Sequence, residues 1–60
     1  MKIKELFSIM DSEDYSAEEL RDKDYLIDRI KTILDWEGVN VGEERVKELA
    51  NLYQKNRIKN

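Results

Sequence analysis

The absence of cysteine and histidine most constrains what this chain of 60 residues can fold into. Without cysteine there are no disulfides, no thiolate nucleophile and no zinc site built on sulfur, and without histidine the usual general base and the commonest transition-metal ligand are missing. A core of this size rarely contributes more than about 3–5 kcal/mol of net stability. We therefore expect stability to come from close helix packing or from association, with no cofactor and no metal.

Apolar residues recur at helical spacing in three parts of the chain, which predicts an all-α fold. The positions are Ile3, Leu6, Phe7 and Met10 near residues 2–10, then Leu26, Ile27, Ile30, Ile33 and Leu34 before Gly38, and Val46, Leu49, Ala50 and Tyr53 near residues 43–56. We expect a small three-helix unit that forms a single domain over residues 1–60. The basic end of the chain, near 56–60, loses the apolar rhythm and is expected to fray.

Residues that begin and end helices mark the boundaries of these segments. Ser16 and Glu19 have the spacing of a capping box, in which each side chain bonds the backbone N–H of the other residue. Gly38 can adopt the positive φ that ends many helices, with Val39 packing back on the helix. Gly42 is expected to be the N-cap of the last helix.

The stretch from 17 to 37 leaves two interpretations open. It is either one long helix, or a short helical turn at 17–21 followed by a helix that begins near 23. Asp22 or Asp24 would serve as the N-cap of that second helix, because a carboxylate readily accepts hydrogen bonds from the first free N–H groups.

Motifs for catalysis, metal binding and membrane insertion are missing. An EF-hand loop that started at Asp11 would need glycine and glutamate where the chain has Ser16 and Asp22. There is neither a Walker loop nor a G-x-S-x-G motif, and carboxylate pairs arise by chance among 14 acidic residues. No apolar run approaches the roughly 20 residues that span a bilayer. We therefore expect a protein of the cytoplasm that is not an enzyme and has no membrane partner.

A second stripe on the central helix is the candidate partner-binding surface. Its members recur at i, i+4, i+7 and i+11 and lie about 120° from the centre of the apolar face. They are Tyr25, Arg29, Thr32 and Trp36. Tyr, Arg and Trp are the residue types enriched in binding hot spots. The alternative is a wide core, in which the first helix covers Trp36 and Tyr25 is half-buried at an edge.

Charge is segregated along the chain. Seven acidic and two basic residues between 11 and 24 leave a net charge of −5, whereas five basic and one acidic residue between 45 and 60 leave +4. The candidate acidic steering patch consists of Asp11, Glu13, Asp14, Glu18, Glu19 and Asp22. Ordinary helix capping explains much of this pattern, because acidic residues suit helix N-termini and basic residues suit C-termini.

These features predict a non-catalytic protein-interaction module, a small adaptor or inhibitor that binds a larger protein through the stripe and is steered by the acidic patch. One alternative is a self-associating scaffold with the stripe as a homodimer seam. A second alternative is a nucleic-acid-associated protein or an acidic nucleic-acid mimic. Direct DNA binding is disfavoured because Glu43 and Glu44 begin the only candidate recognition helix. In size and composition the chain is similar to phage and plasmid accessory proteins, without a shared motif.

Overall fold

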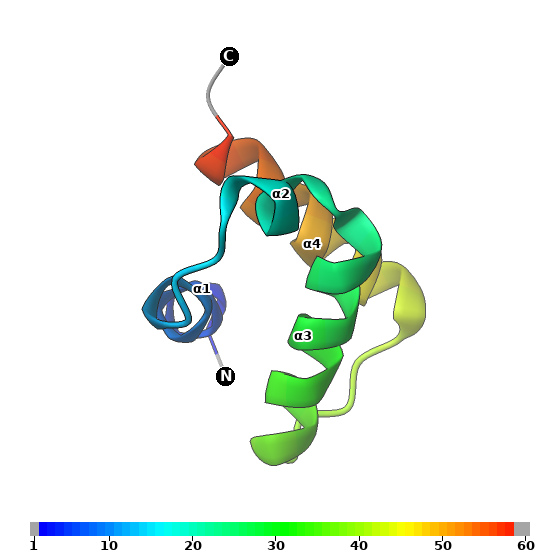
Figure 1. Cartoon of the computed structure of the whole chain (residues 1–60). Helices are drawn as coiled ribbons and strands as arrows, with labels where there is room; N and C mark the ends of the chain where they lie inside the picture. The colour runs from blue at the N-terminus through cyan, green and yellow to red at the C-terminus, as the bar shows by residue number, and fades with distance from the viewer. Residues whose placement is uncertain (1, 59–60) are drawn as a thin grey trace.

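The chain forms four helices in a computed structural model that describes residues 2–58 (Figure 1). The helices are α1 (Ile3–Ser12), α2 (Ala17–Arg21), α3 (Lys23–Trp36) and α4 (Glu43–Arg57). No strand occurs within residues 2–58. The longest helices, α3 and α4, pack against each other, while α2 lies across one end of the pair and α1 lies beside it. The prediction of a small all-α unit is confirmed.

The stretch from 17 to 37 consists of two helices, and Asp22 is the reason. The Ser16 hydroxyl accepts a hydrogen bond from the Glu19 amide at 3.2 Å, and the Glu19 carboxylate accepts one from the Ser16 amide at 2.8 Å. This capping box starts α2. Asp22 then takes an extended conformation, which ends α2, and its carboxylate accepts a hydrogen bond from the Tyr25 amide at 3.1 Å. One residue therefore ends the first helix and caps the second.

The end of α3 is a Schellman motif, as the sequence predicts. Gly38 has a φ of 69°, a conformation that costs glycine little. Its amide donates to the Asp35 carbonyl at 3.1 Å, and the Val39 amide donates to the Leu34 carbonyl at 2.9 Å. These two bonds satisfy carbonyl groups that the end of the helix leaves free. Gly42 is the N-cap of α4, again as predicted.

The first and last helices are longer than the periodicity indicates. α1 continues through Asp11 and Ser12, two polar residues beyond the predicted range of 2–10. The Ser12 hydroxyl donates to the Ile9 carbonyl at 2.6 Å, so it bonds within the helix. The chain leaves α1 through Asp14, which has a φ of 53°. α4 includes Arg57, and residues 59–60 of the tail that we expected to fray lie outside the described residues.

The core gathers apolar side chains from α1, α3 and α4. Its buried members are Leu6, Phe7, Met10, Leu26, Ile30, Ile33, Leu34, Val46, Leu49, Ala50 and Tyr53. The predicted apolar faces account for this set, with two exceptions. Ile3 is 38% exposed because the first turn of α1 lies at the rim of the core, and Ile27 is only half-buried. The short helix α2 adds no fully buried side chain, although Leu20 packs against the edge of the core.

Candidate functional site

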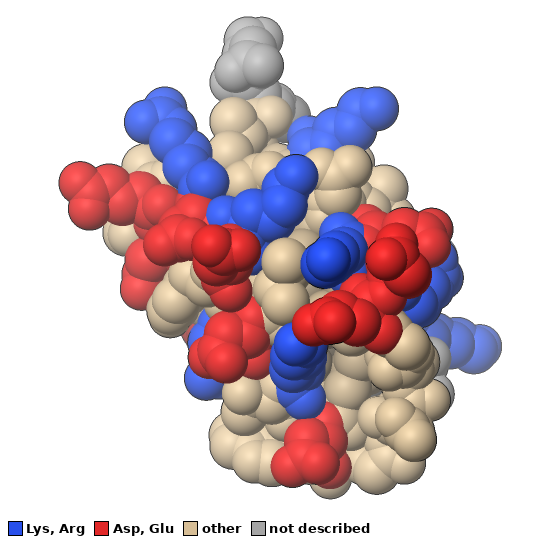
Figure 2. Space-filling view, turned by 90° about the vertical axis from the view of Figure 1, so that its right-hand side faces the viewer, with Lys and Arg blue, Asp and Glu red and all other residues tan. Residues whose placement is uncertain are grey.

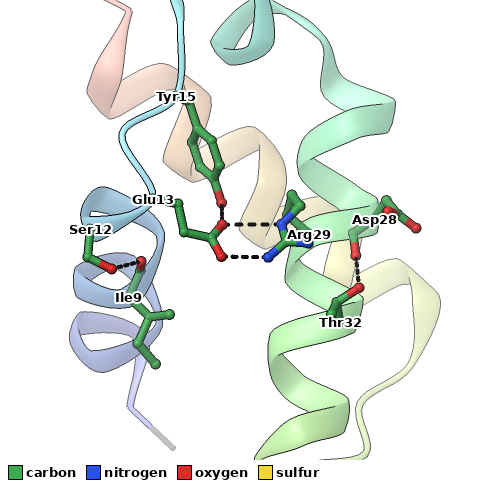
Figure 3. A network of polar contacts seen from close by, with 7 residues as sticks. All are labelled: Ile9, Ser12, Glu13, Tyr15, Asp28, Arg29 and Thr32. Atoms are coloured by element: carbon green, nitrogen blue, oxygen red, sulfur yellow. Dashed lines mark hydrogen bonds and ion pairs between the residues drawn. The ribbon is translucent and has the colours of Figure 1, made fainter.

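A network around Glu13 joins the end of α1 to α3 (Figure 3). The Arg29 guanidinium donates to both carboxylate oxygens of Glu13, from Nε at 3.2 Å and from Nη2 at 2.5 Å. The Tyr15 hydroxyl donates to the same carboxylate. The Tyr15 ring meets the Tyr25 ring edge-on, with centroids 5.8 Å apart. This Glu13 network therefore places Arg29 and Tyr25, two members of the predicted stripe, in contacts within the chain.

A second network, around Asp11, joins α1 to α4 in the same manner. The Arg57 guanidinium donates to both carboxylate oxygens of Asp11 at 2.7 Å, and the Tyr53 hydroxyl donates to Oδ1 at 2.7 Å. The guanidinium also lies 4.6 Å from the centroid of the Tyr53 ring, within the range of a cation–π contact. Because the pairing is bidentate, this Asp11 network fixes orientation as well as distance.

Both carboxylates are stabilised in their charged form. Hydrogen bonds from Arg57, and then from Tyr53, lower the pKa of Asp11. Hydrogen bonds from Arg29 lower the pKa of Glu13 despite its partial burial. The pKa of Tyr53 shifts in the opposite direction. Burial and the hydrogen bond to Asp11 raise the pKa of Tyr53 to about 12. The networks are therefore strongest between the acidic and the basic pKa ranges, where carboxylates are charged and tyrosines neutral.

We expect the two networks to make folding sensitive to acid. A carboxylate whose pKa is lowered on folding contributes stability above its unfolded pKa of about 4, and this contribution is lost as pH falls through the lower folded value. At neutral pH the double substitution Asp11→Asn/Glu13→Gln should cost about 1–3 kcal/mol, since it weakens bonds to charged groups. Between about pH 5 and pH 3 its unfolding free energy, measured by urea titration and circular dichroism, should fall less steeply than that of the wild type.

The matched control is Asp14→Asn/Glu18→Gln, which removes the same number of carboxylates. Neither residue forms an ion pair with any residue between 2 and 58. We expect this control variant to keep the wild-type slope of unfolding free energy against pH. In Asp11→Asn/Glu13→Gln, the slope that remains is expected to come from Glu19 and Glu43, whose pKa values are also lowered by hydrogen bonds. Equal slopes for the two double variants would contradict a stabilising role of the networks.

The predicted stripe divides into a covered part and an open part. Tyr25, Arg29 and Thr32 are half-buried, and the Thr32 hydroxyl donates to a carbonyl one turn earlier in α3. Trp36 is 75% exposed. The wide-core alternative is therefore right for Tyr25 and wrong for Trp36, because α1 reaches α3 at Arg29 and leaves the last turn of α3 uncovered. The four residues lie on one helix face, but only Trp36 is freely available to a partner.

The predicted acidic patch is largely used within the chain. Glu19 and Asp22 cap helices, whereas Asp11 and Glu13 bind arginines. Asp14 and Glu18 are the two members that remain exposed without an ion pair in the part of the chain that the structure describes. The count of charges along the sequence therefore overestimates how much negative charge this segment offers to a partner.

Open carboxylates also occur outside the predicted acidic patch, on α3 and at the residue that follows it. Asp28, Asp35 and Glu37 are exposed, and no Lys or Arg among residues 2–58 pairs with them. Their spacing is the signal that was missed, because Asp28 and Asp35 are seven residues apart and so lie on one side of a helix. Trp36 follows Asp35 directly. Glu37 lies about 180° around the helix axis from Asp28, so the open surface combines one exposed indole with two free carboxylates, Asp28 and Asp35.

A shallow hollow lies next to the α3–α4 loop, and Asp35 is among its lining residues. Leu34, Val39 and Val41 form part of its lining, and the ion pair between Lys31 and Glu43, at 3.0 Å, lies at its edge. Its volume of about 250 Å³ is below the roughly 300–1,000 Å³ that is typical of ligand pockets. This hollow is too small and too open to enclose a substrate, so it is a weaker candidate than the Trp36 surface.

Two other kinds of site receive no support from the described residues. Between residues 2 and 58, no three Asp, Glu, His or Cys side chains gather closely enough to hold a metal ion. No helix in the same range has the length and apolar character needed to cross a membrane. Comparison of the chain with protein-family models, with curated proteins and with solved structures yields no match.

Proposed function

We propose that this protein is a non-catalytic interaction module, a small adaptor or inhibitor, that binds a larger protein through a surface centred on Trp36. The observation that carries the proposal is the 75% exposure of this indole. An apolar side chain of this size forgoes on the order of 2 kcal/mol of hydrophobic free energy when it stays in water. A partner that buries Trp36 would recover this free energy, and Trp is among the residue types that dominate binding hot spots.

The position of Trp36 supports this role, because Trp36 belongs to a helix and not to a loop. Trp36 ends α3, and the Schellman motif that starts at Gly38 stabilises the turn that follows it. A side chain on a rigid helix loses less conformational entropy on binding than one on a mobile loop. In Figure 2 the lower part of the molecule, toward this end of α3, carries fewer charged side chains than the upper part, where Lys, Arg, Asp and Glu gather. The charged upper part would then form the rim of the contact.

We expect Trp36→Ala to weaken partner binding about tenfold or more while changing the free energy of unfolding by less than about 0.5 kcal/mol. The matched control is Leu52→Ala, which removes a 42% exposed apolar side chain from α4. Tagged wild-type and variant chains are used to capture partners from nuclease-treated lysate of the native host, and the affinity for the captured partner is then measured by calorimetry.

Unchanged affinity of the Trp36 variant would refute the proposal. Equal losses for Trp36→Ala and Leu52→Ala would also refute it, because the effect would not be specific to this surface. Sedimentation at several concentrations tests the homodimer alternative. In that alternative the wild type would be a dimer that dissociates on dilution, whereas Trp36→Ala would be a monomer at every concentration. Capture that disappears on nuclease treatment would instead favour association with nucleic acid.

A further inference from the structure

We infer that the partner presents a Lys- and Arg-rich surface with an apolar pocket for Trp36, and that free carboxylates on α3 contact its cations. This inference rests on the proposed function and adds the chemistry of the partner. We call the two carboxylates that share one side of this helix the α3 acidic face and define it as Asp28 and Asp35. Both are exposed, and neither forms an ion pair with a residue of the described range 2–58.

Helix geometry places this face beside the exposed indole. Residues on an α-helix advance by about 100° and 1.5 Å each. Asp28 and Asp35 are therefore about 20° apart around α3 and about 10 Å apart along it, and Trp36 lies within about 100° of both. Figure 3 shows Asp28 pointing away from α1, whereas Arg29 points toward it. The carboxylates are thus on the solvent side of α3, clear of the Glu13 network.

The cations of the same half of α3 do not neutralise this face. Arg29 is engaged by both carboxylate oxygens of Glu13. Lys31, the only basic residue between 30 and 37, donates to Glu43 at 3.0 Å. Because both cations pair with other carboxylates, no Lys or Arg between residues 28 and 37 neutralises Asp28 or Asp35.

Charge complementarity then identifies the partner as a basic protein surface. Opposite charges across an interface steer the encounter and select among partners, whereas like charges repel. A nucleic acid is disfavoured at this face because its phosphates would meet Asp28 and Asp35. Lysine or arginine suits both parts of the surface, since it can pair with a carboxylate and can also stack over the indole of Trp36.

The test uses a random peptide library displayed on phage. Peptides are selected on the wild-type chain and depleted on Trp36→Ala, so that those retained require the indole. We expect the retained peptides to carry net positive charge and to bind less tightly as salt is raised. Trp36 is the only tryptophan of the chain, so its fluorescence reports the affinity of each tryptophan-free peptide directly.

The decisive comparison is between two double variants with the same change in net charge. Asp28→Asn/Asp35→Asn should weaken the selected peptides about three- to tenfold, whereas Asp14→Asn/Glu18→Gln should leave their affinity unchanged. Asparagine suits position 14 because it tolerates the positive φ found there. Circular dichroism of both variants verifies that each is folded.

The outcomes separate this inference from the proposed function. Neutral or acidic peptides that require Trp36 would overturn the basic partner and leave the interaction role intact. Equal affinity for the wild type and D28N/D35N, or equal losses in the two double variants, would also overturn it, because the α3 acidic face would then have no specific role. A selection that yields no peptide dependent on Trp36 would count against the proposed function itself, and the inference would fall with it.

Discussion

Replacing Tyr53 by alanine is expected to lower the free energy of unfolding by about 3–5 kcal/mol, which is comparable to the whole stability of a domain of this size. The Tyr53 side chain is 2% exposed and lies where α1 and the loop after it meet α4. Its ring meets Phe7 edge-on, with centroids 5.1 Å apart, and Tyr15 at 6.2 Å. Its hydroxyl donates to Asp11. Truncation to alanine therefore removes the ring contacts with Phe7 and Tyr15 and also the hydrogen bond to Asp11.

Tyr53→Phe separates these two contributions. It keeps the ring and removes only the hydrogen bond to Asp11, so we expect a loss of about 1–2 kcal/mol at neutral pH. In the wild type, the pKa of Tyr53 is raised to about 12 on folding. The neutral tyrosine therefore contributes stability below its unfolded pKa of about 10, and this contribution is lost as pH rises toward the folded value.

The wild type and the two Tyr53 variants are unfolded with urea at neutral pH and at about pH 11, and unfolding is monitored by circular dichroism. Tyr53→Phe should lose less stability than the wild type on the move to high pH, because it has no hydroxyl to ionise at this position. Equal destabilisation by alanine and phenylalanine would contradict the packing role of the ring. An alkaline loss of the same size in the wild type and in Tyr53→Phe would contradict the role of its ionisation.

Ile30→Ala is the second substitution with a large expected effect, a loss of about 2–5 kcal/mol. Ile30 is completely buried, near the middle of α3. Alanine has the higher helix propensity, so a loss of stability would arise from the cavity and the lost packing and not from the helix backbone. We expect Ile30→Ala to be largely unfolded at room temperature, with weak helical circular dichroism and poorly dispersed amide signals in NMR spectra.

A graded series makes the Ile30 prediction specific. Ile30→Val removes one methylene group and should cost only about 0.5–1.5 kcal/mol. Leu52→Ala, on the exposed side of α4, should leave stability within about 0.5 kcal/mol of the wild type. A thermal midpoint for Ile30→Ala close to that of Leu52→Ala would contradict the packing of α3 against α4 through this residue.

The helices could be predicted from the sequence because their signals are local. The capping box of Ser16 and Glu19 and the positive φ of Gly38 depend on residues within one or two turns. The choice between one helix and two over 17–37 was harder, because Asp22 can lie within a helix or cap one. Its carboxylate bonds the Tyr25 amide, and the gain in capping outweighs continuity of the helix.

The networks could not be predicted because they join residues far apart in the chain. Arg29 is 16 positions from Glu13, and Arg57 is 46 positions from Asp11. No sequence spacing signals such pairs, since they depend on how α1 crosses the other helices. As a result, charges that looked free in the sequence are paired, and the free carboxylates beside Trp36 were overlooked.

The sequence by itself determined where the helices begin and end, to within a few residues, and which side chains form the core. These properties follow from hydrogen bonds and apolar spacing over a few neighbouring residues. Only the tertiary structure decided which part of the predicted stripe stays open. α1 meets α3 at Arg29, so it covers the middle of the stripe and leaves Trp36 in solvent. Exposure depends on what packs nearby, and periodicity along one helix contains no information about its neighbours.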